Sequence, residues 1–322
     1  MRYLLRRLLH AVLLLWGVSV LSFVFLEMAP GDYFAGMRML PEISPQTLAA
    51  LRTQYGLDRP LPVKYVRWVE SVARGDFGYS FAYNLPARKL LGVRARNTLL
   101  LTGTGAVLSW LLAVPLGVWA ANCRRRSVRR VFGAATSGML AVPELVLALA
   151  LLMIAVRTRL VPAGGMVSLN FDELTFLGKL RDLLAHMLLP VAVIVFGSLP
   201  MLVRHVHAAM LEVLDAPFIR AARAHGLPES WVLFRYALPA AANPLISLFG
   251  FSVATLLSAS LLVEVIVGWP GLGPMLLEAI FARDLFLVIG ATLFSTLFLV
   301  AGNLLADLLM FVADPRIRTE AL

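Results

Sequence analysis

The sequence predicts an all-α integral membrane protein that crosses the bilayer six times. Of its 322 residues, 60% are hydrophobic and 15% are charged, whereas soluble domains average roughly 45–50% apolar and 25% charged residues. Six long apolar runs are separated by polar and basic stretches. None of these runs alternates polar and apolar residues with the period of two that a membrane-spanning β-barrel requires, so we expect helices.

Each apolar run is long enough to cross the hydrocarbon core, which takes about 20 residues in a helix. The predicted spans are Leu8 to Met28, Thr98 to Ala121, Val131 to Val156, Leu183 to Val203, Ala240 to Val263, and Leu285 to Val312. The first run follows basic residues, as a signal peptide does, but it exceeds the apolar region of about 7–15 residues found in cleaved signals. We therefore expect it to be retained as the first span.

Four regions follow from these spans. Residues 1–29 form the first transmembrane helix, and residues 30–96 form an extracytoplasmic segment in which prolines separate two predicted helices, Ser44 to Tyr55 and Val63 to Ala73. Residues 97–313 form a five-helix core that includes a long inner loop, 205–238. Residues 314–322 form a cytoplasmic tail.

The distribution of basic residues predicts the orientation. An even number of spans places both termini on one side of the membrane, and most arginines near the span ends fall on that same side. They are Arg2, Arg6, Arg7, Arg124, Arg125, Arg126, Arg129, Arg130, Arg204, Arg220, Arg223, Arg235, Arg316 and Arg318. We expect this side to be cytoplasmic, although Arg157, Arg159, Lys179 and Arg181 in an outer loop oppose the assignment.

Charge and cysteine content exclude several functions. The net charge of +10 comes from basic residues scattered between apolar runs, which favours contact with anionic lipid headgroups over nucleic acid. Cys123 is the single cysteine, so neither an intrachain disulfide nor a multi-cysteine zinc site is possible. His205 and His207 do not face each other on a helix, so packing at the membrane edge is favoured over metal binding. We expect no metal site and no catalytic residue.

The inner loop is patterned as a short capped helix followed by a second helix. Asp215 is the predicted N-cap, Pro217 lies in the first turn, and Gly226 ends the helix, which gives a helix from Ala216 to His225. A new helix begins at Pro228 and leads into the fifth span. A short amphipathic helix held between two spans suits docking on a cytoplasmic partner.

The faces of this predicted helix differ in chemistry. Phe218, Ile219 and Ala222 share one side, and Arg220 and Arg223 share another. The spacing faintly resembles a DNA-binding helix-turn-helix, but a helix tethered to the bilayer at both ends cannot readily enter a major groove.

The loop resembles the EAA loop of ATP-binding-cassette importer permeases. The matching residues are Ala221-Ala222-Arg223-Ala224-His225-Gly226 and, nine residues later, Tyr236-Ala237-Leu238-Pro239. Arg220 stands where the general pattern has Glu, and Tyr236 stands where it has Ile. The Arg-Ala-Ala-Arg-Ala form is similar to the peptide and nickel branch, in which Lys is usual at the position of His225.

Further matches extend the resemblance over nearly the whole chain. They are Tyr55-Gly56-Leu57-Asp58-Arg59-Pro60-Leu61-Pro62-Val63, Gly75-Asp76-Phe77-Gly78-Tyr79-Ser80, Asn97-Thr98-Leu99, Glu264 with Trp269-Pro270-Gly271-Leu272-Gly273, Arg283-Asp284, and Asp314-Pro315-Arg316-Ile317-Arg318. In this order they resemble the B-type permease subunit of dipeptide, oligopeptide and nickel importers. Two residues depart from the pattern: Tyr33, where Pro is usual after Pro30-Gly31-Asp32, and Glu144, where a small residue is usual.

The resemblance implies half of a heterodimeric type I importer pore in a bacterial inner membrane, carrying peptides, or nickel and related small solutes. It implies three partners: a homologous second permease, cytoplasmic ATPase subunits and an extracytoplasmic solute-binding protein. The only Gly-Lys pair, Gly178-Lys179, lies outside any P-loop pattern. ATP and Mg²⁺ are thus expected on the partner subunits, with no cofactor bound by this chain.

The resemblance also assigns candidate sites. The expected ATPase-coupling residues are Asp215, Phe218, Arg220, Ala221, Ala222, Arg223, Ala224, His225 and Gly226. Glu144 and Glu264 are candidates for lining the translocation pathway, because intramembrane acids usually face a bundle interior or a watery cavity. Trp269, Pro270 and Gly271 form either an outer gate or a tight turn, since Pro and Gly dictate backbone shape in both cases.

Three alternatives remain open from sequence. A secondary transporter would be polytopic too, but it favours an inverted repeat, which this chain lacks. An intramembrane enzyme needs a catalytic constellation in the spans, and a purely structural membrane subunit would not bind an ATPase. Among substrates, peptides are favoured over nickel complexes and sugars.

Overall fold

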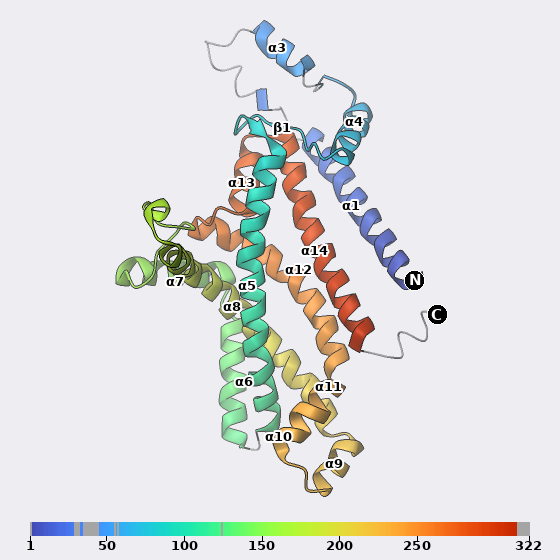
Figure 1. Ribbon diagram of the computed structural model, residues 1–322, viewed down its shortest axis with the longest axis vertical. Coiled ribbons are helices and arrows are strands. Elements are labelled where there is room, and N and C mark those ends of the chain that lie inside the picture. The colour runs from blue at the N-terminus through green and yellow to red at the C-terminus, as the bar shows by residue number, and fades with distance from the viewer. Residues whose placement is uncertain are drawn as a thin grey trace. The chain divides into compact units, whose positions relative to one another are not determined.

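The computed structural model describes residues 2–28, 33–34, 45–54, 56, 58–123 and 125–313 (Figure 1). The helices are α1 (Arg2–Met28), α3 (Pro45–Gln54), α4 (Leu61–Ala73), α5 (Ala87–Asn122), α6 (Arg126–Leu140), α7 (Glu144–Thr158), the 3₁₀ turn η1 (Phe171–Glu173), α8 (Phe176–Leu214), α9 (Pro217–Ala224), α10 (Glu229–Trp231), the π-helix η2 (Val232–Ala237), α11 (Leu238–Ala240), α12 (Ala242–Val267), α13 (Leu272–Phe281) and α14 (Leu285–Ala313). Two short strands, β1 (Tyr79–Ser80) and β2 (Leu85–Pro86), pair antiparallel, with Tyr79 opposite Pro86. The motif Pro30-Gly31-Asp32 and the tail 314–322 lie outside the described residues.

Within the described residues, five helices are long and apolar enough to cross a membrane: α1, α5, α8, α12 and α14. A sixth span exists only if α6 and α7 are counted together, and these two helices meet at an angle of 92°. Five of the six predicted spans are confirmed as single helices, and the predicted third span, Val131 to Val156, is broken into α6 and α7. The break falls at Ala141–Pro143, because Pro143 has no N–H to continue the helix and holds an extended conformation with ψ 140°.

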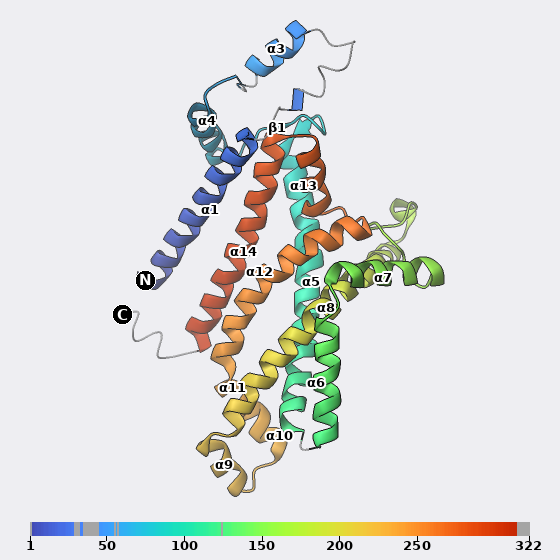
Figure 2. The same cartoon turned by 180° about the vertical axis from the view of Figure 1, so that it is seen from behind.

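The chain divides into two compact units. The first contains Met1–Arg2, Leu99–Trp269 and Ala301–Leu322, and the second contains Tyr3–Thr98 and Pro270–Val300. In the first unit, α8 packs against α6, α7 and α12 (Figures 1 and 2). Glycines allow the close approach of α5 to α8, because a Cβ at Gly105 would lie 2.6 Å from Ile194 and one at Gly117 would lie 2.6 Å from Val206.

The second unit is organised around aromatic side chains. Phe23 of α1 packs edge-on against Tyr65 and Trp68 of α4, and Ile289 of α14 completes this buried cluster. The two helices predicted in the outer segment are confirmed as α3 and α4, with boundaries shifted by one or two residues. Contact between α1 and α4 is reinforced by the Ser19 and Tyr65 hydroxyls, which lie 2.8 Å apart.

A buried carboxylate connects the strand segment of the second unit to the start of α14. Asp284 is fully buried, and its Oδ2 accepts hydrogen bonds from the Ser80 hydroxyl at 2.7 Å and from the Ala82 N–H at 3.1 Å. Two of the short motifs that sequence comparison singled out, Gly75 to Ser80 and Arg283-Asp284, therefore meet in space although about 200 residues separate them.

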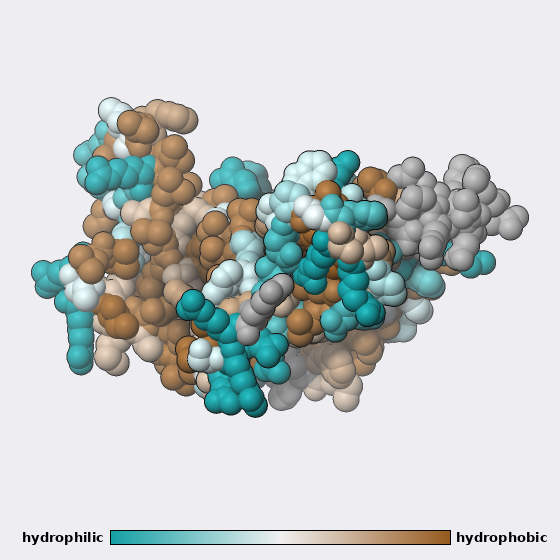
Figure 3. Space-filling view, turned by 90° about the horizontal axis from the view of Figure 1, so that it is seen from below, coloured by the Kyte–Doolittle hydropathy of each residue, from teal (hydrophilic) through white to brown (hydrophobic). Residues whose placement is uncertain are grey.

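Large apolar side chains remain exposed along the long helices, as a bilayer-embedded protein requires. They include Leu111 of α5, Ile154 of α7, Phe251 of α12 and Leu308 of α14. Hydrophobic residues cover broad areas of the face drawn in Figure 3, next to hydrophilic clusters. The described chain is thus suited to lipid contact rather than to full solvation.

Candidate functional site

The loop between α8 and α12 contains the short helix that the sequence singled out. α9 spans Pro217–Ala224, with Ala216 as N-cap, His225 as C-cap and Gly226 in the left-handed conformation at φ 75°. The expected stop at Gly226 and the position of Pro217 are confirmed. The expected N-cap is wrong, because α8 continues to Leu214 and Asp215 is its C-cap.

One face of α9 is buried in the first unit. Ile219 and Ala222 are 0% and 7% exposed, and they belong to a cluster that includes Val206 and Met210 of α8 and Val232 of η2. Phe218, which was predicted to share a side with Ile219 and Ala222, is 48% exposed, so only the other two residues of that side are buried. With about 100° of rotation per residue, Ile219 and Ala222 define the centre of a narrow stripe, and Phe218 lies at its edge.

The opposite face of α9 is open. Arg220, Ala221, Ala224 and His225 are exposed, and Arg223 is partly exposed at the edge opposite Phe218. The small side chains of the two alanines leave the helix backbone accessible between the basic groups. This face therefore offers a narrow, positively charged ridge to any partner.

Polar contacts fix the orientation of α9. The Arg223 guanidinium makes two hydrogen bonds to the Glu229 carboxylate of α10, Nη2 to Oε1 at 2.7 Å and Nε to Oε2 at 3.3 Å. At the other end, Arg220 Nη2 donates to the Asp215 carbonyl at 3.3 Å. Both ends of the loop are tied back to flanking elements, so the exposed face is held in place.

The chain returns to the membrane through an irregular helix. A π-helix at Val232–Ala237 leads into α11, and Pro239 lies two residues beyond it. Proline cannot donate to the carbonyl four residues earlier, which is one cause of such local changes in helix winding. Trp231, Phe234 and Tyr236 project outward from this stretch, so exposed aromatic rings follow the α9 ridge along the chain.

Glu144 occupies a different setting from the one expected. It is the first residue of α7, directly after the break at Pro143, rather than a residue near the middle of a span. Its side chain is partly exposed and lies against α8, where Oε1 would be 3.4 Å from a Cβ at Gly197. The position at a helix N-terminus favours the negative charge, because the helix dipole is positive there.

Glu264 is fully buried near the end of α12. Its backbone carbonyl accepts hydrogen bonds from Gly268 and from Trp269, the latter at 2.9 Å, which closes the C-terminus of the helix. The two acids proposed for the pathway thus differ in access: Glu144 reaches the surface of this chain, and Glu264 does not.

The Trp269-Pro270-Gly271 segment is a tightly held turn between α12 and α13. Gly268 is left-handed at φ 67°, and the Trp269 ring is fully buried in the core of the first unit. In the second unit, the Pro270 carbonyl accepts from Asn97 Nδ2 at 2.8 Å, and the Leu272 N–H donates to Thr98 Oγ1 at 2.8 Å. The motif Asn97-Thr98 therefore serves to hold this turn.

No group of three or more His, Cys, Asp or Glu side chains is placed to hold a metal among the residues that the structure describes. His205 is exposed, and its Nδ1 lies 2.8 Å from the Met201 carbonyl one turn earlier. Sequence reasoning missed the environment of His207, which lines a cavity together with Arg129 and Arg204. The run of basic residues at 124–130 was the available signal.

These features define a polytopic membrane protein with a structured loop between α8 and α12. The chain belongs to the family described as binding-protein-dependent transport system inner membrane component, which matches residues 113–319. The N-terminal part of the same kind of protein matches residues 1–95. The chain is accordingly a permease of the ATP-binding-cassette importer class, and the secondary-transporter alternative is not supported.

Relatives of known name match over almost the full length. The chain is 35% identical to the oligopeptide transport system permease protein AppB of Bacillus subtilis, covering 98% of each chain. It is 34% identical to the dipeptide transport system permease protein DppB of Escherichia coli K12, covering 99% of each. It is 32% identical to the oligopeptide transport system permease protein OppB of Mycobacterium bovis, also covering 99% of each.

A solved structure supports the fold. A chain of the MetNI methionine ABC transporter, in an inward-facing conformation, superposes with a TM-score of 0.55 at 18% identity. The match covers 70% of this chain and 96% of that chain. The fold is therefore that of ABC importer permeases, and the resemblance drawn from the sequence motifs is confirmed.

Proposed function

We propose that this chain forms half of the translocation pathway of a peptide importer and that ATP hydrolysis on partner subunits drives it. The observation that carries the proposal is α9, a helix whose inner face is locked into the core while its outer face remains open. The peptide permeases of Bacillus subtilis and Escherichia coli, which match over the full length, support peptides as the substrate class.

The α9 ridge is the proposed docking site for a cytoplasmic ATPase. A helix that presents one face to a groove binds with little further ordering cost when it is already formed and oriented. Here Ile219 and Ala222 anchor the helix, and the Arg223–Glu229 pair sets its angle. ATP and Mg²⁺ are assigned to that partner, and this chain receives the conformational change of the ATPase through α9.

A second homologous permease and an extracytoplasmic binding protein complete the proposed assembly. The bacterial inner membrane is the proposed location, with both termini and α9 on the cytoplasmic side. The arginines that flank α5, α6 and α8 support this orientation, since cytoplasmic loops carry an excess of basic residues. Asp58 and Asp76 then lie on the outer side.

Glu144 is the proposed pathway residue. A carboxylate at the start of α7, partly exposed beside Gly197, can contact a cationic group in a passage bordered by α7 and α8. The full burial of Glu264 favours a packing role for that residue, and the hydrogen-bonded turn at Trp269-Pro270-Gly271 favours a structural role over a gate.

The test is isolation of the tagged full-length chain with its native partners, followed by reconstitution in proteoliposomes. We expect an ATPase to co-purify with the chain. Uptake of a radiolabelled dipeptide should require Mg-ATP on the side of the membrane that carries the ATPase. Exchanging Phe218 and Arg220 for Asp should remove the ATPase from the complex, whereas Arg181→Gln, remote from α9, should not. Uptake at an equal rate without any ATPase would reject the proposal.

A further inference from the structure

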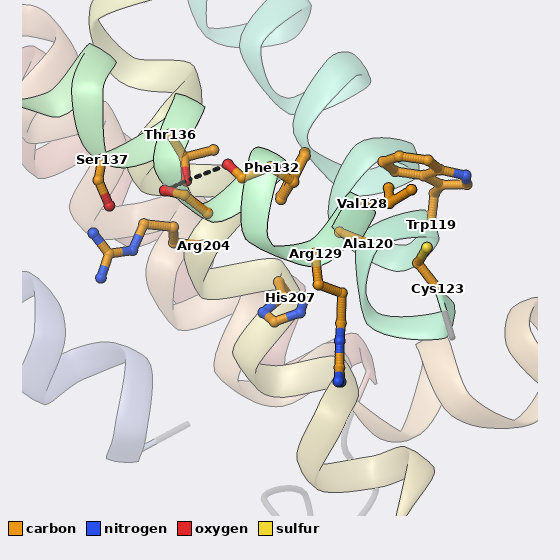
Figure 4. A pocket seen from close by; sticks show the side chains of 11 residues that line it. Trp119, Ala120, Cys123, Val128, Arg129, Phe132, Thr136, Ser137, Arg204 and His207 are labelled. Carbon is orange, nitrogen blue, oxygen red and sulfur yellow. Dashed lines mark hydrogen bonds between the residues drawn. The ribbon is translucent and has the colours of Figure 1, made fainter. Parts of the chain in front are cut away.

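A cavity of about 230 Å³ opens between the end of α5, the first turns of α6 and the second half of α8 (Figure 4). All of its lining residues belong to the first unit. One part of the wall is apolar and consists of Trp119, Val128 and Phe132. The other part contains the cationic side chains of Arg129 and Arg204 together with the imidazole of His207. A cavity that combines these two chemistries fits a ligand with an anionic end and an apolar end.

The charge around the cavity is unbalanced. No acidic residue lines it, and the sequence contains no Asp or Glu between Phe77 and Pro143. On α8 no acid occurs between Asp182 and Glu212. Neither Arg129 nor Arg204 takes part in a salt bridge among the described residues. Two guanidinium groups are therefore available to an external anion, with Arg126 and Arg130 on the same helix adding to the positive potential.

The placement of the cavity fits the headgroup level of a bilayer. It lies beside the end of the apolar stretch of α5, where α5 ends at Asn122, and its α6 lining runs from Val128 to Ser137. Trp119 is 51% exposed beside it, as tryptophans at membrane–water interfaces are. Figure 4 shows Arg204 next to Ser137 at one side of the cavity and Arg129 near His207, so the basic groups come from two helices.

We propose that this cavity binds the phosphate group of an anionic phospholipid. Arg129, beside His207, holds the phosphate oxygens, and Arg204 adds positive charge at the other side of the cavity, beside Ser137. The Trp119, Val128 and Phe132 side chains contact the glycerol and the first methylenes of the acyl chains. The volume of about 230 Å³ suits a headgroup but not whole acyl chains. Basic pockets between membrane helices are a recognised type of site for anionic headgroups.

A free phosphate ion is the competing occupant. It would satisfy the arginines, but it leaves the apolar wall without a role. The proposal therefore commits to the lipid, and it is independent of the coupling role assigned to α9.

The thiol of Cys123 can report whether the cavity is occupied. Cys123 is the only cysteine and lines the cavity with a partly exposed thiol. The full-length complex in zwitterionic nanodiscs should react with a maleimide at Cys123 at a rate that falls about tenfold when phosphatidylglycerol is included. An equal rate with and without phosphatidylglycerol would overturn the proposal.

Two variants test the assignment of the arginines. Arg129→Gln with Arg204→Gln should abolish the protection, whereas Arg126→Gln with Arg130→Gln removes the same charge from α6 positions that do not line the cavity and should retain it. Loss of protection in both pairs would mean that general surface charge suffices and would contradict a specific site. Native mass spectrometry of the same proteins should show retained phosphatidylglycerol only in wild type and the control pair.

A third variant keeps every charge and fills the space. A Cβ at Gly133 would meet nothing within 4 Å, and this residue lines the cavity, so Gly133→Leu places bulk in it while favouring the helix. It should reduce phosphatidylglycerol retention about as much as the arginine pair does. Inorganic phosphate at millimolar concentration, added instead of lipid, should leave the labelling rate unchanged. Protection by phosphate alone would show that the site takes a free anion and would reject the lipid.

Discussion

Arg223 of α9 and Glu229 of α10 form a two-point ion pair across the turn at Gly226, with the shorter contact at 2.7 Å. Both side chains are about one third exposed or more, so the pair adds little to folding stability, roughly 0.2–1 kcal/mol. The pair instead fixes the orientation of α9, and with it the direction in which the exposed face of α9 points.

Glu229→Gln is expected to lower coupling more than stability. Removing the charge loosens Arg223, so substrate-stimulated ATPase activity of the assembled importer should fall several-fold while the melting temperature changes little. A double-mutant cycle with Arg223→Gln measures the pair directly. Arg235→Gln, on the exposed side of η2, serves as the charge control. A large loss of stability with normal coupling would contradict the orienting role.

Gly226→Val is expected to weaken ATPase docking and transport together. Gly226 has a left-handed conformation, which costs a β-branched residue about 1–2 kcal/mol. A Cβ there would meet nothing within 4 Å, so the penalty comes from the backbone alone and not from crowding. Gly226→Asn is the matched control, since Asn tolerates this conformation better. Co-purification of the ATPase should decline in the order wild type, Asn, Val, and normal stimulated ATPase activity in the Val variant would reject the idea.

The orientation can be measured with single cysteines in a Cys123→Ser background. Cysteines at Arg125 and His225 should resist a membrane-impermeant maleimide in intact cells, and cysteines at Asp58 and Asp76 should react. The reason is the excess of arginines on the first side. Permeabilised cells provide the control that all four sites can react. Labelling of position 225 from outside would reverse the topology.

Glu144→Gln is expected to reduce uptake of cationic peptides and to leave neutral ones nearly unchanged. The substitution keeps the shape of the side chain at the start of α7 and removes the charge that a peptide amino group would contact. Glu173→Gln, in the turn η1 on a loop, is the control for loss of one negative charge. If both substrate classes are transported equally by the Glu144 variant, the residue only packs against Gly197.

Asp284→Asn is expected to destabilise the second unit by about 1.5–3 kcal/mol, the range for hydrogen bonds to a charged group. The carboxylate is fully buried and accepts from Ser80 and Ala82, so an amide leaves at least one donor badly matched. Thermal unfolding of the purified chain in detergent is the measurement. Glu278→Gln, an exposed acid on α13, should shift the midpoint much less. Equal shifts of the unfolding midpoint for both variants would mean that the buried Asp284 carboxylate stabilises the protein no more than the exposed Glu278 carboxylate does.

The fold followed from sequence where local rules suffice. Apolar length located the spans, and Pro217 and Gly226 located α9. The errors arose where a helix outlasts its apolar run: α8 continues eleven residues past Val203, so Asp215 ends α8 instead of starting α9. Pro143 did carry the information for the break between α6 and α7, but hydropathy averaged over a window conceals a single proline.

The side-chain environments required the tertiary structure. The meeting of Ser80 with Asp284 depends on segments about 200 residues apart, and the basic cavity depends on the packing of three helices. Phe218 was grouped with Ile219 and Ala222 because the helical spacing alone does not say where the buried stripe is centred. That centre is set by Val206 and Met210 of α8, which receive Ile219 and Ala222.

The length of α8 has a mechanical consequence. The helix is continuous over 39 residues despite Pro190 and Pro200, which corresponds to about 58 Å. It contacts α9 at one end and α7, behind Glu144, farther along. A rigid rod of that length that pivots by about 5° at one end sweeps the other through about 5 Å. A small displacement of α9 would thus be amplified geometrically at a distance, with α8 acting as a lever arm and with no need for unfolding or rewinding along the way.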